Sequence, residues 1–259
     1  MTTTLITGAS GGIGEEFARR LASERHDLIL VARSREKLNE LAAALSSKYK
    51  IETNVIVADL TERDAPQEVF KETEQAGLKV DWLINNAGFG AYGDFANGDI
   101  EHDTQMIELN IRALVALTRL YLPAMRERRS GQIINVSSAA GFQPIPFMAA
   151  YAATKAFVNS FSEAIAEENR PFGIHVLALC PGSTKTNFFN AARMDKPIQV
   201  KGQQTVDEVV DTALKAVKGG RTRIVSGFVN DAVARVVNFV PNRFITHVLA
   251  RATRDRYQK

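Results

Sequence analysis

Near its start, the chain has an apolar, β-branched run that ends in a glycine-rich turn and leads into a helical pattern. The run is TTTLIT and the turn is GASGGIG, at residues 8–14. Apolar residues then recur at Ile13, Phe17 and Leu21, the spacing of a helix with one buried face. A second apolar run, DLILVA, is typical of a strand covered on both faces. These elements predict a βαβ unit, which requires a parallel sheet.

The same alternation of strands and helices continues along the chain. It predicts one α/β domain over residues 1–259, a doubly wound Rossmann-type fold with a mostly parallel seven-stranded sheet flanked by helices. A length of 259 residues is within the range of a single domain of this class. The further strands are predicted at 51–58, 80–84, 132–136, 173–179 and 223–225. Helices are predicted at 35–48, 65–76, 100–128, 151–169 and 206–217.

The glycine-rich turn lies where a Rossmann-type fold binds the pyrophosphate of a dinucleotide. Glycines permit close approach of the backbone, and the free N–H groups of the following helix attract phosphate. A tight turn without a ligand is the alternative. The tip of the second strand then distinguishes between cofactors, because NAD-binding sites place a carboxylate there. Here the residues are Arg33 and Ser34, which suit a 2′-phosphate, so we predict NADP rather than NAD.

Two other predicted strand ends carry polar or small residues. Asp59 follows the third strand and could accept a hydrogen bond from an adenine amino group, or it could cap the next helix. Asn86, Ala87 and Gly88 follow the fourth strand, where a nucleotide lying across the sheet edge needs small residues. Asn and Gly are also common in turns, so a purely local role is the alternative.

A tyrosine and a lysine lie four residues apart in the predicted helix 151–169. This spacing presents the Tyr151 phenol and the Lys155 ammonium on one helix face. A nearby cation favours the phenolate, so we expect the pKa of Tyr151 to be lowered. Such a pair could exchange a proton with an alcohol or ketone oxygen near neutral pH. Taken alone, it could equally be a solvated surface pair.

Composition excludes several other classes of protein. The net charge of +3, without basic runs, argues against nucleic-acid binding. A single cysteine, Cys180, excludes internal disulfides, and we recognise neither a signal peptide nor a transmembrane run, so we expect a cytoplasmic protein. The four histidines are scattered and have no metal-ligand spacing, so we expect no metal site.

Two segments are distinct from this repeating pattern. Residues 187–205 lack clear periodicity and contain Phe188 and Phe189, which suggests a substrate lid or a long loop. Together with Phe142 and Phe147, these side chains point to a partly apolar substrate. Residues 228–259 form an amphipathic basic C-terminal extension, for which we favour packing on the domain or on another subunit over contact with a membrane surface.

The motifs together resemble the short-chain dehydrogenase/reductase family over nearly the whole chain. The TGxxxGxG and NNAG motifs match at residues 7–14 and 85–88, and the PG motif matches Pro181 and Gly182. The family's catalytic serine precedes the tyrosine by thirteen residues here, which selects Ser138 over Ser137. One departure is Gly11, where many NADP-preferring members carry a basic residue. The chain is most similar to NADP-preferring members that act on 3-oxoacyl compounds or hydroxysteroids.

The resemblance implies a catalytic set made of Asn110, Ser138, Tyr151 and Lys155. In that set the tyrosine exchanges the proton, the lysine assists the tyrosine and the ribose, the serine binds the substrate oxygen, and the asparagine holds a relay water. The implied cofactor contacts are Gly8, Ser10, Gly12, Ile13, Gly14, Arg33, Ser34, Asp59, Leu60, Asn86, Ala87, Gly88, Tyr151, Lys155, Pro181, Gly182 and Thr186.

We therefore expect an NADP(H)-dependent oxidoreductase that acts on a small-molecule alcohol or carbonyl substrate. The alternative is a nucleotide-sensing or scaffolding protein with the same fold and no turnover, because fold alone does not imply catalysis. The intact catalytic set argues against that alternative. The resemblance also implies a homodimer or homotetramer.

Overall fold

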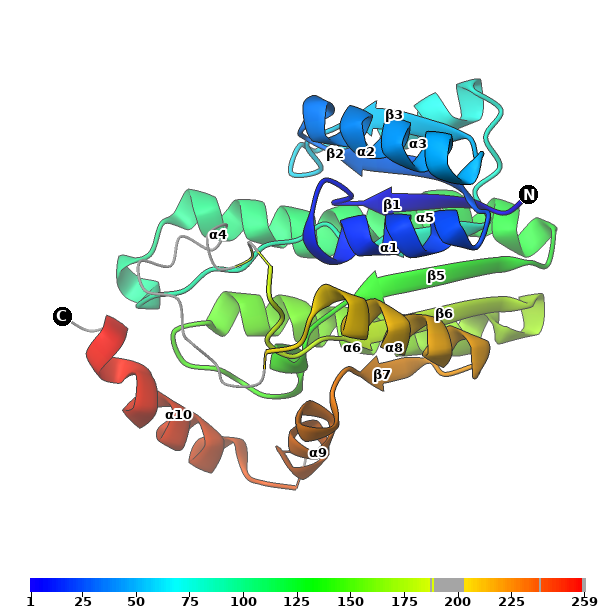
Figure 1. Ribbon diagram of the computed structural model, residues 1–259. Coiled ribbons are helices and arrows are strands. Elements are labelled where there is room, and N and C mark those ends of the chain that lie inside the picture. Colours follow the sequence, from blue (N-terminus) through cyan, green and yellow to red (C-terminus); the bar gives the residue numbers. More distant parts are fainter. Residues whose placement is uncertain (187, 189–202, 238, 258–259) are drawn as a thin grey trace.

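The computed structural model describes residues 1–186, 188, 203–237 and 239–257. Its strands lie in one seven-stranded sheet with the order β3-β2-β1-β4-β5-β6-β7, and each neighbouring pair is parallel (Figure 1). The order reverses direction beside β1, as in a doubly wound fold. The strands are β1 (Thr3–Thr7), β2 (Asp27–Ala32), β3 (Thr53–Val57), β4 (Trp82–Asn85), β5 (Gly131–Val136), β6 (Ile174–Cys180) and β7 (Arg223–Val225).

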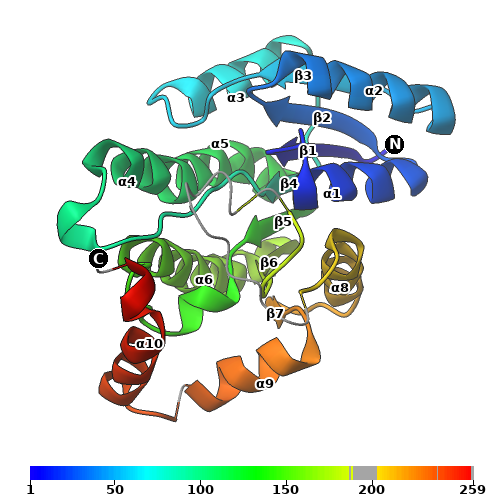
Figure 2. The ribbon, with the colours of Figure 1, turned by 60° about the vertical axis from the view of Figure 1, so that its left-hand side comes forward.

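Helices cover both faces of this sheet (Figures 1 and 2). One face packs against α1 (Gly12–Ser23), α2 (Arg35–Tyr49) and α8 (Val206–Lys218), and the other packs against α3 (Ala65–Gln75), α5 (Leu114–Glu127) and α6 (Ala149–Asn169). Each face has its own apolar core, formed by the alternate residues of buried strands such as Ile29 and Leu30. Helices therefore cover both faces of the sheet, as predicted for a doubly wound fold.

The helix predicted at 100–128 is present, but its hydrogen-bond pattern changes in the middle. It begins as α4 (Ile100–Ile107), passes through the π-helical turn η2 (Glu108–Ala113) and continues as α5. Asn110 lies in this turn and is buried. A π-turn adds one residue to a helical turn and is common at functional sites. Periodicity alone could not indicate it, because the apolar pattern resumes after the turn.

Short helical turns occupy several of the connections. They are η1 (Phe95–Asn97), η3 (Ala139–Phe142) and η4 (Arg170–Phe172). The turn η3 begins directly after Ser138 and brings the chain from the end of β5 back toward α6. Most of the predicted lid at 187–205 lies outside the described residues, Phe189 included.

The C-terminal extension forms two further helices, α9 (Phe228–Val237) and α10 (Asn242–Tyr257). Helix α9 packs on the sheet edge through Ala234, which joins the apolar cluster that contains Cys180 and Val225, whereas Phe228 and Phe239 are exposed. In both views α10 extends away from α9 toward the end of the molecule at which the strands finish (Figures 1 and 2). No described helix combines the length and apolar character needed to cross a bilayer.

A chain of buried polar side chains joins the sheet to α5 and α6. The Asn85 Nδ2 atom donates to Asn135 Oδ1 at 2.9 Å and to Thr118 Oγ1 at 3.0 Å. Asn135 in turn donates to Ser162 Oγ at 2.9 Å. Asn85 and Asn135 are register partners on β4 and β5, so this pairing fixes the two central strands at their carboxyl ends.

We predict that Asn135→Ala destabilises the fold. The variant leaves the Asn85 amide and the Ser162 hydroxyl without Asn135 in a buried setting, which costs about 2–4 kcal/mol of unfolding free energy. Urea denaturation followed by circular dichroism measures this change. Asn54→Ala on the edge strand β3 is the matched control, since Asn54 is half-buried and its side chain has no hydrogen bond within the described residues. Equal stability of the two variants would contradict the prediction.

Candidate active site

The four predicted catalytic residues come from three elements and meet near the carboxyl ends of β4 and β5. Tyr151 and Lys155 lie in the first turns of α6, Ser138 follows β5, and Asn110 lies in η2. Tyr151 is 6% exposed and Lys155 is 5% exposed, so the pair is not a solvated surface pair. The Lys155 Nζ atom is 5.8 Å from the centre of the Tyr151 ring.

The environment of Tyr151 raises the pKa of its phenol to about 12 rather than lowering it as predicted from sequence. Burial is the main cause and disfavours the phenolate, and a hydrogen bond with Ser138 offsets only part of the effect. Ser138, not Ser137, is the partner, in agreement with the spacing. The Ser137 hydroxyl instead donates to the backbone carbonyl of Lys155 at 2.9 Å.

Burial also changes the ionisation of Lys155. It lowers the pKa of the ammonium to about 8, although the nearby Cys180 acts in the opposite direction. The Nζ atom donates to the carbonyl of Val136, the last residue of β5, at 3.0 Å. A Cβ atom on Gly88 would lie 3.5 Å from the same nitrogen. Lys155 is therefore held between the ends of β4 and β5, with its charge directed toward the site.

The side chain of Asn110 explains why an asparagine occupies the middle of a long helix. Its Nδ2 atom donates to the carbonyl of Phe89 at 2.9 Å and to Thr154 Oγ1 at 3.2 Å, while its Oδ1 atom accepts from the Phe89 amide at 3.2 Å. Thr154 was not predicted from sequence, and its hydroxyl also donates to the carbonyl of Tyr151 at 2.7 Å. Asn110 thus connects η2 to the turn of α6 that carries the tyrosine.

The glycine-rich turn has the geometry that a dinucleotide pyrophosphate requires. Gly8 and Gly12 have φ angles of +66° and +60°, a region that favours glycine. A Cβ atom on Gly14 would lie only 2.4 Å from the Gly8 carbonyl oxygen. Helix α1 begins after Gly11 without a side-chain cap, which leaves its first N–H groups available to an anion. Ser10 and Ile13 lie within this turn and first helical residues.

Asn86 shapes this turn from the neighbouring strand. Its Nδ2 atom donates to the carbonyls of Thr7 and Gly8 at 2.9 and 3.3 Å. The Thr7 hydroxyl accepts from the amides of Asn86 and Ala87, both at 2.9 Å. The NNAG segment therefore holds the glycine turn in place through the Asn86 side chain.

Arg33 and Asp59 lie together at the other end of the predicted cofactor site. Their side chains form an ion pair at 3.5 Å, and Arg33 is 74% exposed. Burial alone would raise the pKa of Asp59, but hydrogen bonds from Thr61 and the charge of Arg33 hold it below its usual value. Ser34 precedes α2 and makes no side-chain capping bond. Arg33, Ser34 and the start of α2 therefore form an exposed site suited to a phosphate.

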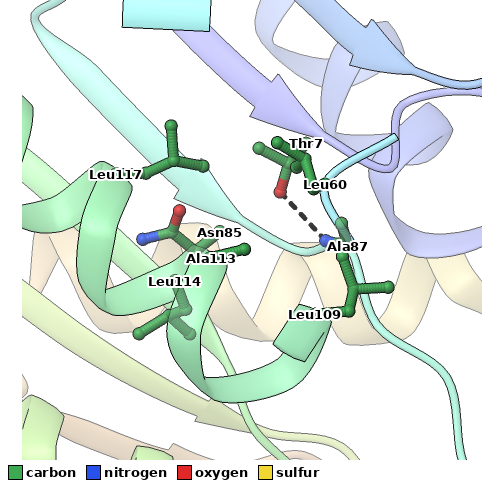
Figure 3. A pocket seen from close by; sticks show the side chains of 8 residues that line it. All are labelled: Thr7, Leu60, Asn85, Ala87, Leu109, Ala113, Leu114 and Leu117. Carbon is green, nitrogen blue, oxygen red and sulfur yellow. Dashed lines mark hydrogen bonds between the residues drawn. The ribbon is translucent and has the colours of Figure 1, made fainter. Parts of the chain in front are cut away.

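A small pocket lies beside the ends of β1 and β4 (Figure 3). It is bounded by the ends of β1 and β4 on one side and by η2 and α5 on the other. Leu60, a predicted cofactor contact, is one of its walls. The lining residues are Thr7, Leu60, Asn85, Ala87, Leu109, Ala113, Leu114 and Leu117.

The segment after β6, which contains the predicted cofactor contacts Pro181, Gly182 and Thr186, passes close to the glycine turn. A Cβ atom on Gly12 would lie 3.4 Å from Thr186 Cγ2, and the carbonyl of Pro181 accepts from the Ala139 amide at 2.8 Å. The Phe188 ring lies 5.4 Å from the Tyr151 ring, so it contributes an apolar surface at the tyrosine. Phe142, by contrast, packs against the small apolar cluster behind the site.

The described residues contain no cluster of side chains suited to a metal ion. The site instead combines a proton donor, a buried cation and an uncapped helix N-terminus at one sheet edge. Such an arrangement on a Rossmann-type fold has the chemical groups needed to hold a dinucleotide and to exchange a proton beside it.

Comparison with known proteins identifies the family. The family model described as short chain dehydrogenase matches residues 2–197. The protein "Very-long-chain 3-oxoacyl-CoA reductase-A" of Danio rerio is 38% identical over 199 residues, which are 74% of this chain and 62% of that protein. The very-long-chain 3-oxoacyl-CoA reductase of Macaca fascicularis is 31% identical over 98% of this chain and 81% of its own length. The chain thus spans less than two thirds of the length of the Danio rerio protein.

A solved structure agrees with this assignment. The short-chain dehydrogenase from Sphingobium yanoikuyae in complex with NADPH has a TM-score of 0.83 and 32% identity, over 93% of this chain and 96% of that one. The chain belongs to the short-chain dehydrogenase/reductase family. Its members are oxidoreductases that act on carbonyl and hydroxyl groups with a nicotinamide cofactor, and the sequence prediction of the family is confirmed.

We predict that Gly14→Ala weakens nucleotide binding by about tenfold or more. The added methyl would lie 2.4 Å from the Gly8 carbonyl oxygen and 2.5 Å from Asn86 Nδ2, so the turn must deform, at about 1–3 kcal/mol. Gly11→Ala is the control, because Gly11 has φ 172°, extended backbone, and a Cβ there meets no atom within 4 Å. Calorimetric titration with NADPH separates the two, and equal affinities would contradict the prediction.

We also predict a pH-dependent contribution of Lys155 to stability. An unfolded lysine has a pKa of about 10.4, and burial lowers that of Lys155 to about 8. Between these pH values the unfolded chain binds more protons, so the free energy of unfolding rises with pH. Wild type should gain about 3 kcal/mol relative to Lys155→Met as the pH increases from 7 to 10.5. Urea denaturation at several pH values measures this difference, and a constant difference would contradict the assignment.

Proposed function

We propose that the protein is an NADP(H)-dependent oxidoreductase that reduces or forms the carbonyl group of a partly apolar substrate. The observation that carries this proposal is the buried Tyr151–Lys155 pair beside Ser138, at the same sheet edge as the uncapped start of α1. A nucleotide sensor would need the uncapped helix N-terminus but has no evident need for a buried tyrosine paired with a serine.

The residues of the site have distinct roles in this proposal. When bound, the nicotinamide supplies or accepts the hydride. Tyr151 keeps its proton at neutral pH because burial raises its pKa to about 12, and it donates that proton to the substrate oxygen in the direction of reduction. Ser138 hydrogen-bonds the same oxygen and stabilises the charge that develops there. The Lys155 ammonium holds the ribose and favours the phenolate after the proton has moved.

Two observations support the proposed substrate class: the contact between Phe188 and Tyr151, and the names of the relatives. The Phe188 ring lies beside Tyr151 and offers an apolar surface where the reacting carbonyl must be bound. Relatives that cover most of this chain are named as very-long-chain 3-oxoacyl-CoA reductases, which act on a ketone with an apolar chain. We therefore propose 3-oxoacyl thioesters as the first class to test, with bulky ketones and steroids as comparisons.

The preference for NADP rests on Arg33 and Ser34. An exposed guanidinium and an uncapped hydroxyl at the start of α2 can both bind a 2′-phosphate. Asp59 pairs with the guanidinium at 3.5 Å and so restrains it at the end of β2. The NADPH complex of the Sphingobium yanoikuyae protein supports this choice.

We predict that Tyr151→Phe abolishes turnover while NADPH binding persists. Loss of the proton donor should reduce the rate by about 10²–10⁴-fold. Consumption of NADPH with a panel of aldehydes, ketones, steroids and 3-oxoacyl thioesters provides the assay. Undiminished turnover in the variant would overturn the catalytic assignment, and no turnover by wild type with any substrate would favour a nucleotide sensor.

We predict that Arg33→Ala weakens NADPH binding by about tenfold or more, because a charge-assisted hydrogen bond to phosphate is lost. Binding of NADH should be unchanged. Arg19→Ala is the control, since the Arg19 guanidinium pairs with Glu15 on the outer side of α1. Titration of each variant with both nucleotides measures the effect. Equal losses for NADPH and NADH would contradict the assignment of Arg33 to the 2′-phosphate.

A further inference from the structure

Asn230 of α9 contacts a backbone segment that belongs to the cofactor site. A Cβ atom on Gly182 would lie 2.0 Å from Asn230 Nδ2 and 2.4 Å from Asn230 Cγ. The amide of Asn230 therefore occupies the space that a side chain at position 182 would need. Helix α9 lies beyond residue 197, where the match to the family model ends, and the sequence motifs did not indicate this residue.

Asn230 is itself held in place by the turn that precedes α9. Its Nδ2 atom donates to the carbonyl of Ser226 at 2.8 Å. Ser226 is fully buried and follows β7 directly, and its amide donates to the carbonyl of Cys180 at the end of β6 at 3.1 Å. Gly227 has φ +88°, and a Cβ atom there would lie 2.9 Å from the same Nδ2 atom. The position of the Asn230 side-chain amide is thus set by the turn at Ser226 and Gly227, which is bonded to the end of β6.

The segment that follows Gly182 is fixed by a second set of contacts. Thr184 pairs with Gln204 in a parallel bridge, in which the Lys185 amide donates to the Gln204 carbonyl at 2.9 Å and the Gln204 amide donates to the Ser183 carbonyl at 3.0 Å. Beyond the bridge, Thr186 contacts the glycine turn at Gly12. Residues 182–186 therefore connect α9 at one end to the phosphate-binding turn at the other.

We propose that Asn230 is a positioning residue for the nicotinamide half of the cofactor. The inference rests on the proposed function, in which the nicotinamide is bound at Tyr151; residues 182–186 lead to that end of the site, because the Phe188 ring lies beside the Tyr151 ring. The Asn230 amide packs against Gly182 and thereby holds residues 182–186 in the conformation in which Thr186 contacts Gly12. Removing the amide leaves space behind Gly182 and lets the segment move away from the nicotinamide. The adenine half, at Arg33 and Asp59, lies at the other end of the site.

Two ligands of different length test this proposal on the full-length protein. NADPH reaches both halves of the site, whereas adenosine 2′,5′-bisphosphate reaches only the adenine half. For Asn230→Ala we expect calorimetric titration to give about tenfold weaker binding of NADPH, with unchanged binding of the bisphosphate. Asn230→Asp should show the same pattern, because a carboxylate has the same shape but cannot donate to the Ser226 carbonyl.

Asp231→Ala is the matched control. Asp231 is the next residue of α9 and pairs with Arg235 on the exposed side, so its loss should change neither affinity. Wild-type affinity for both ligands in Asn230→Ala and Asn230→Asp would overturn the proposal. Equal weakening of both ligands would also overturn it, since Asn230 would then support the fold as a whole. If wild type binds neither ligand, the proposed function itself fails.

Discussion

The contact between Gly14 and the carbonyl of Gly8 is the constraint on which the rest of the site depends. Because there is no room for a side chain between them, the turn brings the start of α1 against the end of β1. Asn86 and Thr7 then fix the same turn to the end of β4, and Thr186 covers it from the far side. The parallel sheet aligns the ends of its central strands, so the proton-handling residues meet the turn at one edge.

Tyr151 and Lys155 are held in an environment that is costly for the charged form of each group. Burial disfavours both the phenolate of Tyr151 and the ammonium of Lys155, and this raises one pKa while lowering the other. The pKa of the tyrosine therefore lies above that of the lysine, which disfavours a resting pair of phenolate and ammonium. An uncharged phenol and a partly neutral amine are the favoured resting forms near pH 8, and a cationic ring beside them would shift that balance. The fold thus makes the charge state of the site depend on what is bound.

Local sequence patterns were sufficient to predict the strands, the glycine turn and the shared helix face of Tyr151 and Lys155, because each depends on short-range spacing, whereas Ser138 was selected through the family resemblance. The direction of the pKa shift at Tyr151 was wrong, since spacing places the lysine on the same helix face but does not report how much of that face is buried. The π-turn at η2 was missed for a similar reason: the apolar pattern continues through it. The contact between Gly182 and Asn230 joins residues far apart in the chain, and no local pattern carries it.

Gly11 has a consequence for how readily this protein can change over evolution. Its backbone is extended and the space around it is open, in contrast to the crowded Gly8 and Gly14 on either side. Arg33 is similarly exposed. Under the proposed function, the positions that would discriminate between nucleotides can therefore be exchanged without repacking, whereas Gly8 and Gly14 cannot. Under that proposal, coenzyme choice is open to single substitutions at exposed positions, while the shape of the glycine turn resists change.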